Sequence, residues 1–497
     1  MALQQTSYRG CLLGMAVGDA MGYTVDNRSL AEIQEDYGPN GLLGYDLVNG
    51  YADVTSNTQL AAFTCNGLLF GLTRGQMTGK MAPFIKYIAL SSCEWAASQR
   101  TSGRPTRNYC WLPRRAEICR RRCMETRMVE TLGRRNLGTL ETPTNNYNSP
   151  YGLAAAVAVG LFYDEDRMDQ REIDRLGAEA VALTHGSPIA FLSGAVLAHI
   201  MSKLLRKPDA PLKKVVMEAS EAMKEQFGHQ YSQAFEIATL LRHAITYSET
   251  HGVRPVEIME KLGCDTAAQV LAGAVYACLV SGSDFDRAMI VSVNHSGRSS
   301  AVGAIAGAIL GIRLGEEALP EFYIECLEPA EVLRELAEVK ASYDKVAEAL
   351  RDCEEGGYGI VMPEVADMRL DEPEIVRQSG GYGVRLKASA PSIHMIRANI
   401  EAEVNPIVGS EQQSEDLVRY MLKEFDEDPA RIWESNMFGK TLYELLMDIY
   451  VEYGFSKEVA VSVVKPGKSG ADEIKQMMEN FRANPLKTMA GEPVVAY

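Results

Sequence analysis

The stretch that decides the fold reads Val293-Asn-His-Ser-Gly-Arg298-Ser-Ser-Ala-Val-Gly303 and continues as Ala304-Ile-Ala-Gly-Ala-Ile-Leu-Gly-Ile312. The small residues of its second half predict a helix whose backbone packs closely against a neighbour. A polar, glycine-containing loop in front of such a helix is a common place to bind an anion. The sequence from Ser292 to Ile312 holds no carboxylate, and Arg298 stands in its middle as a cation.

The composition narrows the class of protein. A chain of 497 residues is too long for one ordinary core and predicts two or three domains. A formal net charge of -16 argues against general binding to nucleic acid or to an anionic membrane. Ten cysteines without a framework suit a reducing cytosol. The N-terminus does not resemble a signal peptide, and no uninterrupted run of about 18 apolar residues occurs. We therefore expect a cytoplasmic protein without a transmembrane segment.

Two stretches near the N-terminus predict buried helices. Residues 8–23 carry Gly10, Gly14, Gly18 and Gly22 at helical spacing, which favours tight helix packing and a helix that ends near Gly22. A loop with the turn signals of residues 38–41 follows. The next helix is expected to run through Gly71, with Thr55 or Asn57 as its N-cap.

A period of about 3.6 residues in the apolar pattern then predicts further helices separated by short polar turns. Thr184-His185-Gly-Ser-Pro188 interrupts one of them, and a lone histidine there is more often a core residue than a ligand. Up to about residue 320 the chain is expected to be all-helical. The predicted segments are Gly152–Phe162, Asp174–Leu205, Leu212–Glu225, Tyr231–Glu249 and Ala267–Leu279.

Residues 100–135 hold eleven arginines and three glutamates in an otherwise acidic chain. One interpretation is a solvated, arginine-rich helix pair that pairs with acidic surface elsewhere. The other is a patch for phosphate or an acidic partner, because arginine binds oxyanions through two hydrogen bonds at once. Cys110, Cys119 and Cys123 lie in this segment without zinc-site spacing and are interpreted as ordinary thiols.

The pattern changes after Pro320. Residues 329–354 predict a charged amphipathic helix that serves as a connector. Alternation of period two over Tyr382–Ala390 and Ser392–Val404 predicts strands, and an acidic helix is expected over Glu411–Phe425. The sequence therefore predicts a multidomain chain: an all-α domain over 1–325, a helical connector over 326–355, and a smaller α+β domain over 356–497.

Residues 8–320 resemble the ADP-ribosylglycohydrolase family, whose fold is all-helical. The resemblance rests on Gly10-Cys-Leu-Leu-Gly-Met-Ala-Val-Gly-Asp-Ala-Met-Gly22, on Leu183-Thr-His-Gly-Ser-Pro188, and on Asn294 through Gly311 with Pro320 after it. The resemblance implies a hydrolase with two divalent metals, usually magnesium, held mainly by carboxylates, since hard cations need hard oxygen ligands.

Both metal motifs of the family have lost their acids in this chain. Where the family has Thr-Asp-Asp-Thr, the sequence reads Thr55-Ser56-Asn57-Thr58, and where it has Gly-Asp-Ser-Asp-Thr, the sequence reads Gly297-Arg298-Ser299-Ser300-Ala301. Ala154 and Ala155 stand near the positions of the family's glycine-rich Met-Arg stretch. Hydroxyls, an amide and a guanidinium cannot balance the roughly four positive charges of two magnesium ions. We therefore expect no metal and no cofactor, with Arg298 beside the vacated site.

The candidate site follows from these motifs. The degenerate metal positions are Thr55, Ser56, Asn57, Arg298, Ser300 and Ala301. No catalytic residue is expected, because Asp19, His185 and His295 are each interpreted as packing with a local hydrogen bond. Asp53 could supply one metal ligand at most. The candidate pocket residues are Asp19, Asp53, Thr184, His185, Asn294, Gly297 and Arg298.

Residues 329–445 resemble a second family, that of stage IV sporulation protein A, the ATPase that forms the basement layer of the spore coat. The matching segments include Gly357-Tyr-Gly-Ile-Val-Met-Pro363, Gly381-Tyr-Gly-Val-Arg-Leu-Lys-Ala-Ser-Ala-Pro391 and Ile432-Trp-Glu-Ser-Asn-Met-Phe-Gly-Lys440. No Gly-x-x-x-x-Gly-Lys-Ser/Thr motif occurs, so the family's P-loop half is missing. The sequence departs from the family after about residue 447, where the apolar tail that helps target the forespore membrane is replaced.

Three hypotheses follow. The first is a non-catalytic assembly or scaffold component of the spore coat, on the mother-cell face of the forespore, that contacts coat proteins or the sporulation ATPase. The second is a metal-dependent ADP-ribosyl hydrolase acting on a sporulation target, which the missing acids oppose. The third is a reader that binds ADP-ribose or a nucleotide through Arg298 or the arginine-rich segment. Homo-oligomerisation is left open by the sequence.

Overall fold

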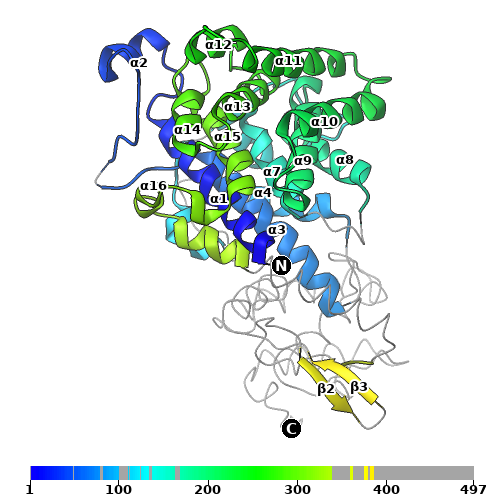
Figure 1. Cartoon of the computed structure of the whole chain (residues 1–497). Helices are drawn as coiled ribbons and strands as arrows, with labels where there is room; N and C mark the ends of the chain where they lie inside the picture. The colour runs from blue at the N-terminus through cyan, green and yellow to red at the C-terminus, as the bar shows by residue number, and fades with distance from the viewer. Residues whose placement is uncertain are drawn as a thin grey trace. The chain divides into compact units, whose positions relative to one another are not determined.

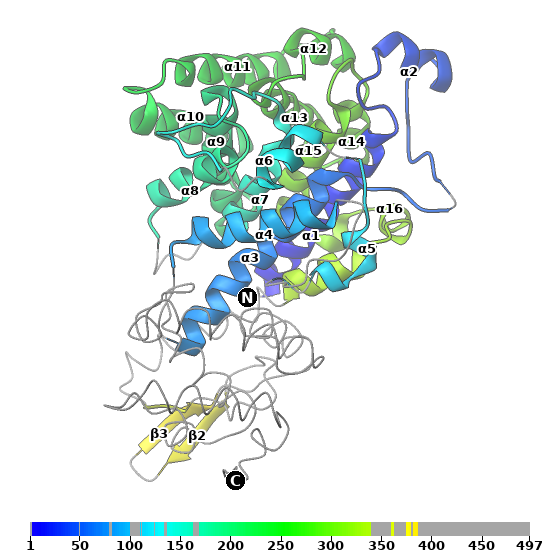
Figure 2. The ribbon, with the colours of Figure 1, turned by 180° about the vertical axis from the view of Figure 1, so that it is seen from behind.

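The computed structural model describes residues 2–48, 50–78, 82–99, 110, 112–123, 125–133, 137–162, 168–338, 359–361, 374–378 and 381–385. The chain divides into two compact units, one of residues 1–68, 84–104 and 112–341, the other of the remaining residues. The first unit is all-helical over its described residues, as the sequence predicts, and Figures 1 and 2 show its helices from two sides. Its α-helices, of which α3 continues past residue 68 into the second unit, are α1 (Ala2–Tyr23), α2 (Leu30–Tyr37), α3 (Ser56–Thr78), α4 (Phe84–Ser98), α5 (Ala116–Cys119), α6 (Thr126–Gly133), α7 (Leu153–Leu161), α8 (Gln170–Ala182), α9 (Pro188–Arg206), α10 (Leu212–Phe227), α11 (Gln233–Ser248), α12 (Pro255–Leu262), α13 (Ala267–Ser281), α14 (Phe285–Val293), α15 (Ser299–Leu314) and α16 (Glu321–Glu325).

The centre of the helical unit is the contact between α1 and α15. A Cβ atom built on Gly18 would lie 1.9 Å from the carbonyl oxygen of Gly303, and one built on Gly14 would lie 2.4 Å from that of Gly307. The two backbones therefore touch directly, which only residues without a side chain allow. Both helices were predicted from their small residues, and the structure shows that each is the close neighbour that the other requires.

Helix α9 forms a second part of the core, with α7, α8, α10, α11 and α13 packed around it. It is the one helix among the described residues that is long and apolar enough to cross a membrane, and 83% of its apolar window is buried inside the unit. The Thr184–Pro188 stretch separates it from α8, as predicted, because Pro188 occupies its first turn.

Some helices were not predicted. Helix α2 lies within the stretch predicted as a loop, and it begins with a capping box in which Ser29 and Glu32 satisfy each other's backbone amides. Helix α3 extends past Gly71 to Thr78. Short helices such as α12 and α14 also escaped the periodicity analysis, since eight or nine residues give too few repeats of the pattern.

The second unit contains three described strands, β1 (Gly359–Val361), β2 (Glu374–Gln378) and β3 (Gly381–Arg385). They form one sheet in the order β1-β3-β2, in which β3 pairs parallel to β1 and antiparallel to β2. Strand β3 falls at the start of the predicted strand over 382–390. The predicted strand over 392–404 and the predicted helix over 411–425 lie outside the described residues, so the α+β class of this region stays a prediction.

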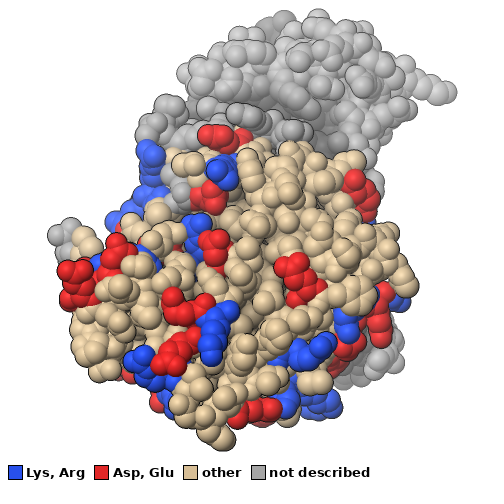
Figure 3. All heavy atoms as spheres, turned by 90° about the horizontal axis from the view of Figure 1, so that it is seen from above, with Lys and Arg blue, Asp and Glu red and all other residues tan. Residues whose placement is uncertain are grey.

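Charged side chains are mixed over the surface of the helical unit. On the face shown in Figure 3, acidic and basic groups lie interspersed among neutral residues, and no extended basic patch stands out among the coloured residues. The described arginines of the 100–135 segment mostly pair with acids: Arg115 with Glu335, and Arg120 and Arg122 with Asp53 and Glu328. For these arginines the contacts match the first interpretation of the segment, pairing with acidic surface elsewhere.

Candidate functional site

Asp19 lies at the centre of a buried polar cluster where α1 meets the start of α3. Its carboxylate accepts hydrogen bonds from the amide and hydroxyl of Thr55 at 2.8 and 2.7 Å, and from the amide and hydroxyl of Thr58 at 3.1 and 2.6 Å. A fifth comes from the side-chain amide of Asn57 at 3.1 Å. We call Asp19, Thr55, Asn57, Thr58 and Ser300 the Asp19 cluster.

Burial raises the pKa of the Asp19 carboxyl, and the hydrogen bonds from Thr55, Thr58 and Asn57 oppose that rise. Asp19 is fully buried at 0% exposure, so the five donors compensate a charge that water cannot reach. Thr55 also caps α3, because its hydroxyl oxygen accepts from the backbone amide of Asn57 at 3.1 Å. The cluster thus fixes the start of α3 against α1.

Ser300, in the first turn of α15, connects this cluster to a second carboxylate. Its hydroxyl oxygen lies 3.4 Å from the side-chain amide of Asn57. Its backbone amide and its hydroxyl both donate to Asp26 Oδ1, at 2.9 and 3.0 Å. Burial raises the pKa of Asp26, and the nearby charge of Asp19 raises it further, while Ser300 and Arg298 lower it. The positions of both metal motifs therefore meet here.

Arg298 precedes α15 and lies at the edge of this arrangement. Its Nε donates to Asp265 Oδ1 at 2.9 Å, and its guanidinium also contacts Asn27 Oδ1 and the Tyr151 hydroxyl. The guanidinium carbon lies 5.8 Å from the centre of the Tyr151 ring. Burial and the charge of Asp26 raise the pKa of Tyr151, so its hydroxyl stays protonated. Arg298 is thus paired with Asp265, and its charge also lowers the pKa of Asp26.

The donor set does not fit a pair of magnesium ions. Magnesium needs near-octahedral oxygen ligands, mostly carboxylates and water. A carboxylate offers about four lone-pair positions, and protein donors already surround those of Asp19. Asn57 and Ser300 donate hydrogen bonds to the two carboxylates. A second metal ligand would instead present an oxygen lone pair to the ion. Across the described residues, no group of three or more histidine, cysteine or acidic side chains is arranged to hold a metal.

Thr184 and His185 belong to a separate group of side chains. His185 Nδ1 lies 2.8 Å from the Thr184 hydroxyl, and His185 Nε2 lies 2.9 Å from the Ser149 hydroxyl. Ser149 also donates to Glu125 Oε2 at 3.2 Å. Burial lowers the pKa of His185 to about 4, so the imidazole is neutral at pH 7. Neither Thr184 nor His185 has a described hydrogen bond to the Asp19 cluster.

The other predicted residues have structural contacts. Asp53 is paired with Arg120 and Arg122, so its carboxylate faces two cations instead of the Asp19 cluster. Asn294 holds the loop before α3 by exchanging hydrogen bonds with the backbone of Leu42 at 2.7 and 2.8 Å. Gly297 adopts a φ of 143° and accepts a hydrogen bond from the amide of Asn27. Ser56 and Ala301 are buried at 1% and 2% exposure, and the backbone amide of Ser56 donates to the carbonyl oxygen of Cys123.

The sequence analysis missed Asp26, Tyr151 and Asp265. Asp26 is the important omission, because it is the second carboxylate at the degenerate site. The sequence carried a signal for a turn: Asp26-Asn27 lies a few residues after the predicted end of the opening helix near Gly22, and aspartate and asparagine favour turns. Asn27 indeed has a φ of 62°, a left-handed conformation that asparagine tolerates. Asp265 and Tyr151 carried no local signal of a site.

With this geometry in place, comparison with known proteins gives the family. A profile of the ADP-ribosylglycohydrolase family matches residues 2–354. The chain belongs to the ADP-ribosylglycohydrolase family. An uncharacterised protein of Archaeoglobus fulgidus is 26% identical over 338 residues, which cover 67% of this chain and 95% of that protein. A solved structure titled ADP-ribosylglycohydrolase-related protein complex is 20% identical, with a TM-score of 0.41 over 68% of this chain and 97% of that one.

The C-terminal part of this ADP-ribosylglycohydrolase family member matches a second family. Profiles of the middle and C-terminal domains of stage IV sporulation protein A match residues 327–409 and 410–452. Stage IV sporulation protein A of Bacillus subtilis is 50% identical over 118 residues, 24% of each chain. That of Clostridioides difficile is 43% identical over 136 residues, 27% of this chain and 28% of its own. The chain spans about a quarter of these relatives' length.

Proposed function

We propose that this protein is a non-catalytic member of the ADP-ribosylglycohydrolase family that acts in endospore formation as an assembly component of the spore coat basement layer. The helical unit would keep the family's scaffold without its metal chemistry. The C-terminal region, similar to stage IV sporulation protein A, would provide the contact with the coat, on the mother-cell face of the forespore. Coat proteins or the sporulation ATPase itself are the proposed partners.

One observation carries the non-catalytic part of the proposal. Asp19 is the carboxylate at the meeting point of α1 and α3, and its oxygens are occupied by five protein donors. A metal ion would have to displace several of these bonds, each worth about 1 to 3 kcal/mol because a buried charge is involved. The replacement of acids by Asn57 and Ser300 leaves few ligands to offset that loss. Without metals, no described group at this site is arranged to activate water.

The catalytic part is tested by incubating the purified chain, with magnesium or manganese, with an ADP-ribosylated peptide and measuring released ADP-ribose. We expect no release above the metal-free reaction. Metal-dependent release would refute the pseudoenzyme assignment. Calorimetry with ADP-ribose, with and without magnesium, distinguishes the reader hypothesis from the assembly hypothesis. Tight binding that does not depend on metal would assign the helical unit a reader role in place of the assembly role.

The sporulation part is tested by a fluorescent fusion in a sporulating host. We expect a ring or cap of fluorescence at the forespore surface that depends on residues 342–452, which lie outside the helical unit. A signal spread evenly through the mother cell would overturn the coat assignment. A deletion of residues 342–452 that leaves the ring intact would show that the helical unit is recruited independently, which also contradicts the proposal.

A further inference from the structure

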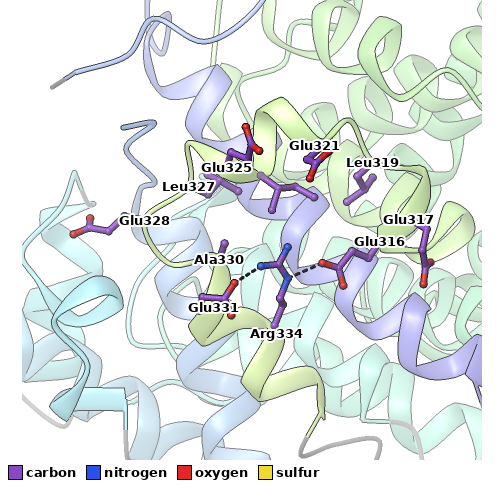
Figure 4. Close-up of a pocket in the computed structure, with 11 residues that line it drawn as sticks. Glu316, Glu317, Leu319, Glu321, Glu325, Leu327, Glu328, Ala330, Glu331 and Arg334 are labelled. Atoms are coloured by element: carbon purple, nitrogen blue, oxygen red, sulfur yellow. Dashed lines mark hydrogen bonds and ion pairs between the residues drawn. The ribbon is translucent and has the colours of Figure 1, made fainter. Parts of the chain in front are cut away.

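A hollow lined by residues other than those of the Asp19 cluster lies between α16 and the helical residues 330–338. Its volume is about 580 Å³, and Figure 4 shows its lining residues. We call it the acidic cleft, because glutamates surround it and apolar residues such as Leu319, Ile324 and Leu327 form the rest of its wall. The six glutamates are Glu316, Glu317, Glu321, Glu325, Glu328 and Glu331.

The charges of the acidic cleft are only partly compensated. Arg334 pairs with Glu316 at 2.6 Å and with Glu331. Glu328 pairs with Arg120 at 2.6 Å and with Arg122 at 2.9 Å. The remaining three, Glu317, Glu321 and Glu325, have no ion pair with any described residue. A cleft with three carboxylates that have no ion-pair partner among the described residues attracts a cationic ligand.

Exposed apolar side chains lie on the segments next to the acidic cleft. Phe322 of α16 stands between Glu321 and Glu325 and is 57% exposed. The backbone of Ala52 pairs with the cleft residue Leu327, and Tyr51, its neighbour in the chain, is 54% exposed. Val48, paired with Tyr51 across a turn, is 66% exposed. Large exposed apolar side chains on segments that adjoin a charged hollow are typical of an interaction surface.

The dimensions of this surface decide what kind of cation it suits. The described residues include no group of three acidic side chains close enough to hold one metal ion. The glutamates of the acidic cleft are therefore spread around its walls and do not converge on one position. A volume of about 580 Å³ accommodates several side chains. A polyamine would neutralise the carboxylates, but it would leave Phe322 and Tyr51 exposed. A peptide segment with both basic and apolar residues covers both kinds of group.

We propose that the acidic cleft, together with Phe322 and Tyr51, is a docking surface for a basic peptide segment of a partner protein, one that carries several lysines or arginines around an apolar side chain. All the lining residues of the cleft fall inside the match to the ADP-ribosylglycohydrolase family, and Glu328 and Glu331 also fall inside the match to the middle domain of stage IV sporulation protein A. It does not depend on whether the metal site is active.

The test uses the full chain and a fluorescein-labelled peptide of lysines around one central phenylalanine, with anisotropy as the readout. We expect saturable binding that weakens as salt is raised. The variant Glu317→Gln/Glu321→Gln/Glu325→Gln should bind at least about tenfold more weakly, since three ion pairs with the peptide are lost at once. Phe322→Ser should weaken binding by several-fold, because its exposed ring is then absent.

A matched control removes the same net charge elsewhere. Glu35, Glu225 and Glu236 are exposed on α2, α10 and α11, so Glu35→Gln/Glu225→Gln/Glu236→Gln should change the affinity by less than about twofold to threefold. Equal weakening in both triple variants would overturn the proposal, because the overall charge of -16 would then explain binding. Absence of saturable binding, full displacement by spermidine at equal concentration, or unchanged affinity of a peptide without phenylalanine would also overturn it.

Discussion

Asp26 accepts two hydrogen bonds from Ser300, one from the backbone amide at 2.9 Å and one from the hydroxyl at 3.0 Å. The same hydroxyl oxygen lies 3.4 Å from the side-chain amide of Asn57, which in turn donates to Asp19. One serine thus connects two carboxylates, the buried one of Asp19 in α1 and the half-buried one of Asp26 in the turn after it. Neutral donors thus surround both carboxylates at the positions of the two motifs.

The first prediction concerns this hydroxyl. Ser300→Ala removes one donor to Asp26 and one contact of Asn57, so the free energy of unfolding should fall by about 1 to 2 kcal/mol. Chemical denaturation followed by circular dichroism measures the loss. Ser299→Ala is the matched control, because the Ser299 hydroxyl has only a long contact of 3.5 Å with the His295 carbonyl and should matter less. If both variants lost the same free energy of unfolding, the hydrogen bond from Ser300 to Asp26 would not contribute to stability beyond an ordinary buried hydroxyl.

The second prediction restores the acids of the family. In the variant Ser56→Asp/Asn57→Asp/Arg298→Asp/Ser300→Asp, new carboxylates join Asp19 and Asp26, and their mutual repulsion should lower the melting temperature without metal. Magnesium should then raise it, by the equivalent of about 2.7 kcal/mol at a hundredfold excess over the dissociation constant. The wild-type chain should show no such rise. A magnesium-dependent rise in the wild type would contradict the conclusion that the residues of this site do not fit magnesium.

Much of the fold could be predicted because its signals are local. The glycines of α1 and the small residues of α15 predict close packing from spacing alone, and Thr55 carries the residue type of an N-cap. The helix break at Thr184–Pro188 likewise follows from a proline in the first turn of α9. The missing acids of the two motifs could also be recognised from the sequence, since the resemblance indicates which positions hold acids in the family.

The partners of those positions could not be predicted. Asp26 meets Ser300 across 274 residues of sequence, and only the tertiary fold brings them together. Arg298 was expected to bring a fixed positive charge to the vacated site, but its pairing with Asp265 depends on the loop between α12 and α13. Asp53 looked like a candidate ligand until the fold paired it with Arg120 and Arg122, from a segment about seventy residues away.

The third prediction concerns pH. The pKa of His185 is about 4 in the fold because burial disfavours the charged imidazole, against 6.5 for an unperturbed histidine. Between these values the unfolded chain binds more protons than the folded one. The free energy of unfolding should therefore fall as the pH falls from about 6.5 to 4, by about 3 kcal/mol from this residue.

His185→Gln tests this contribution, because glutamine keeps a polar group near Ser149 but does not titrate. The stability difference between wild type and variant, measured by denaturation at pH 7 and at pH 4, should shrink towards the acidic end. His229→Gln, at an exposed position, is the control and should follow the wild type at both values. A difference that stays constant with pH would show that His185 does not carry this acid sensitivity.

The last prediction tests the contact at the centre of the helical unit. Gly18→Ala would place a Cβ atom 1.9 Å from the carbonyl oxygen of Gly303 and 2.3 Å from its carbonyl carbon, so α1 and α15 would have to move apart. Overpacking of this kind costs about 3 kcal/mol. Because the same two helices position Asp19 and Ser300, the variant should also loosen the Asp19 cluster, which hydrogen exchange at the amides of Thr55 and Thr58 would detect. Gly44→Ala, with no atom within 4 Å of the added Cβ and no positive φ, should leave both stability and exchange unchanged. If Gly18→Ala were tolerated as well as Gly44→Ala, the two helices would not be in the direct backbone contact that organises this fold.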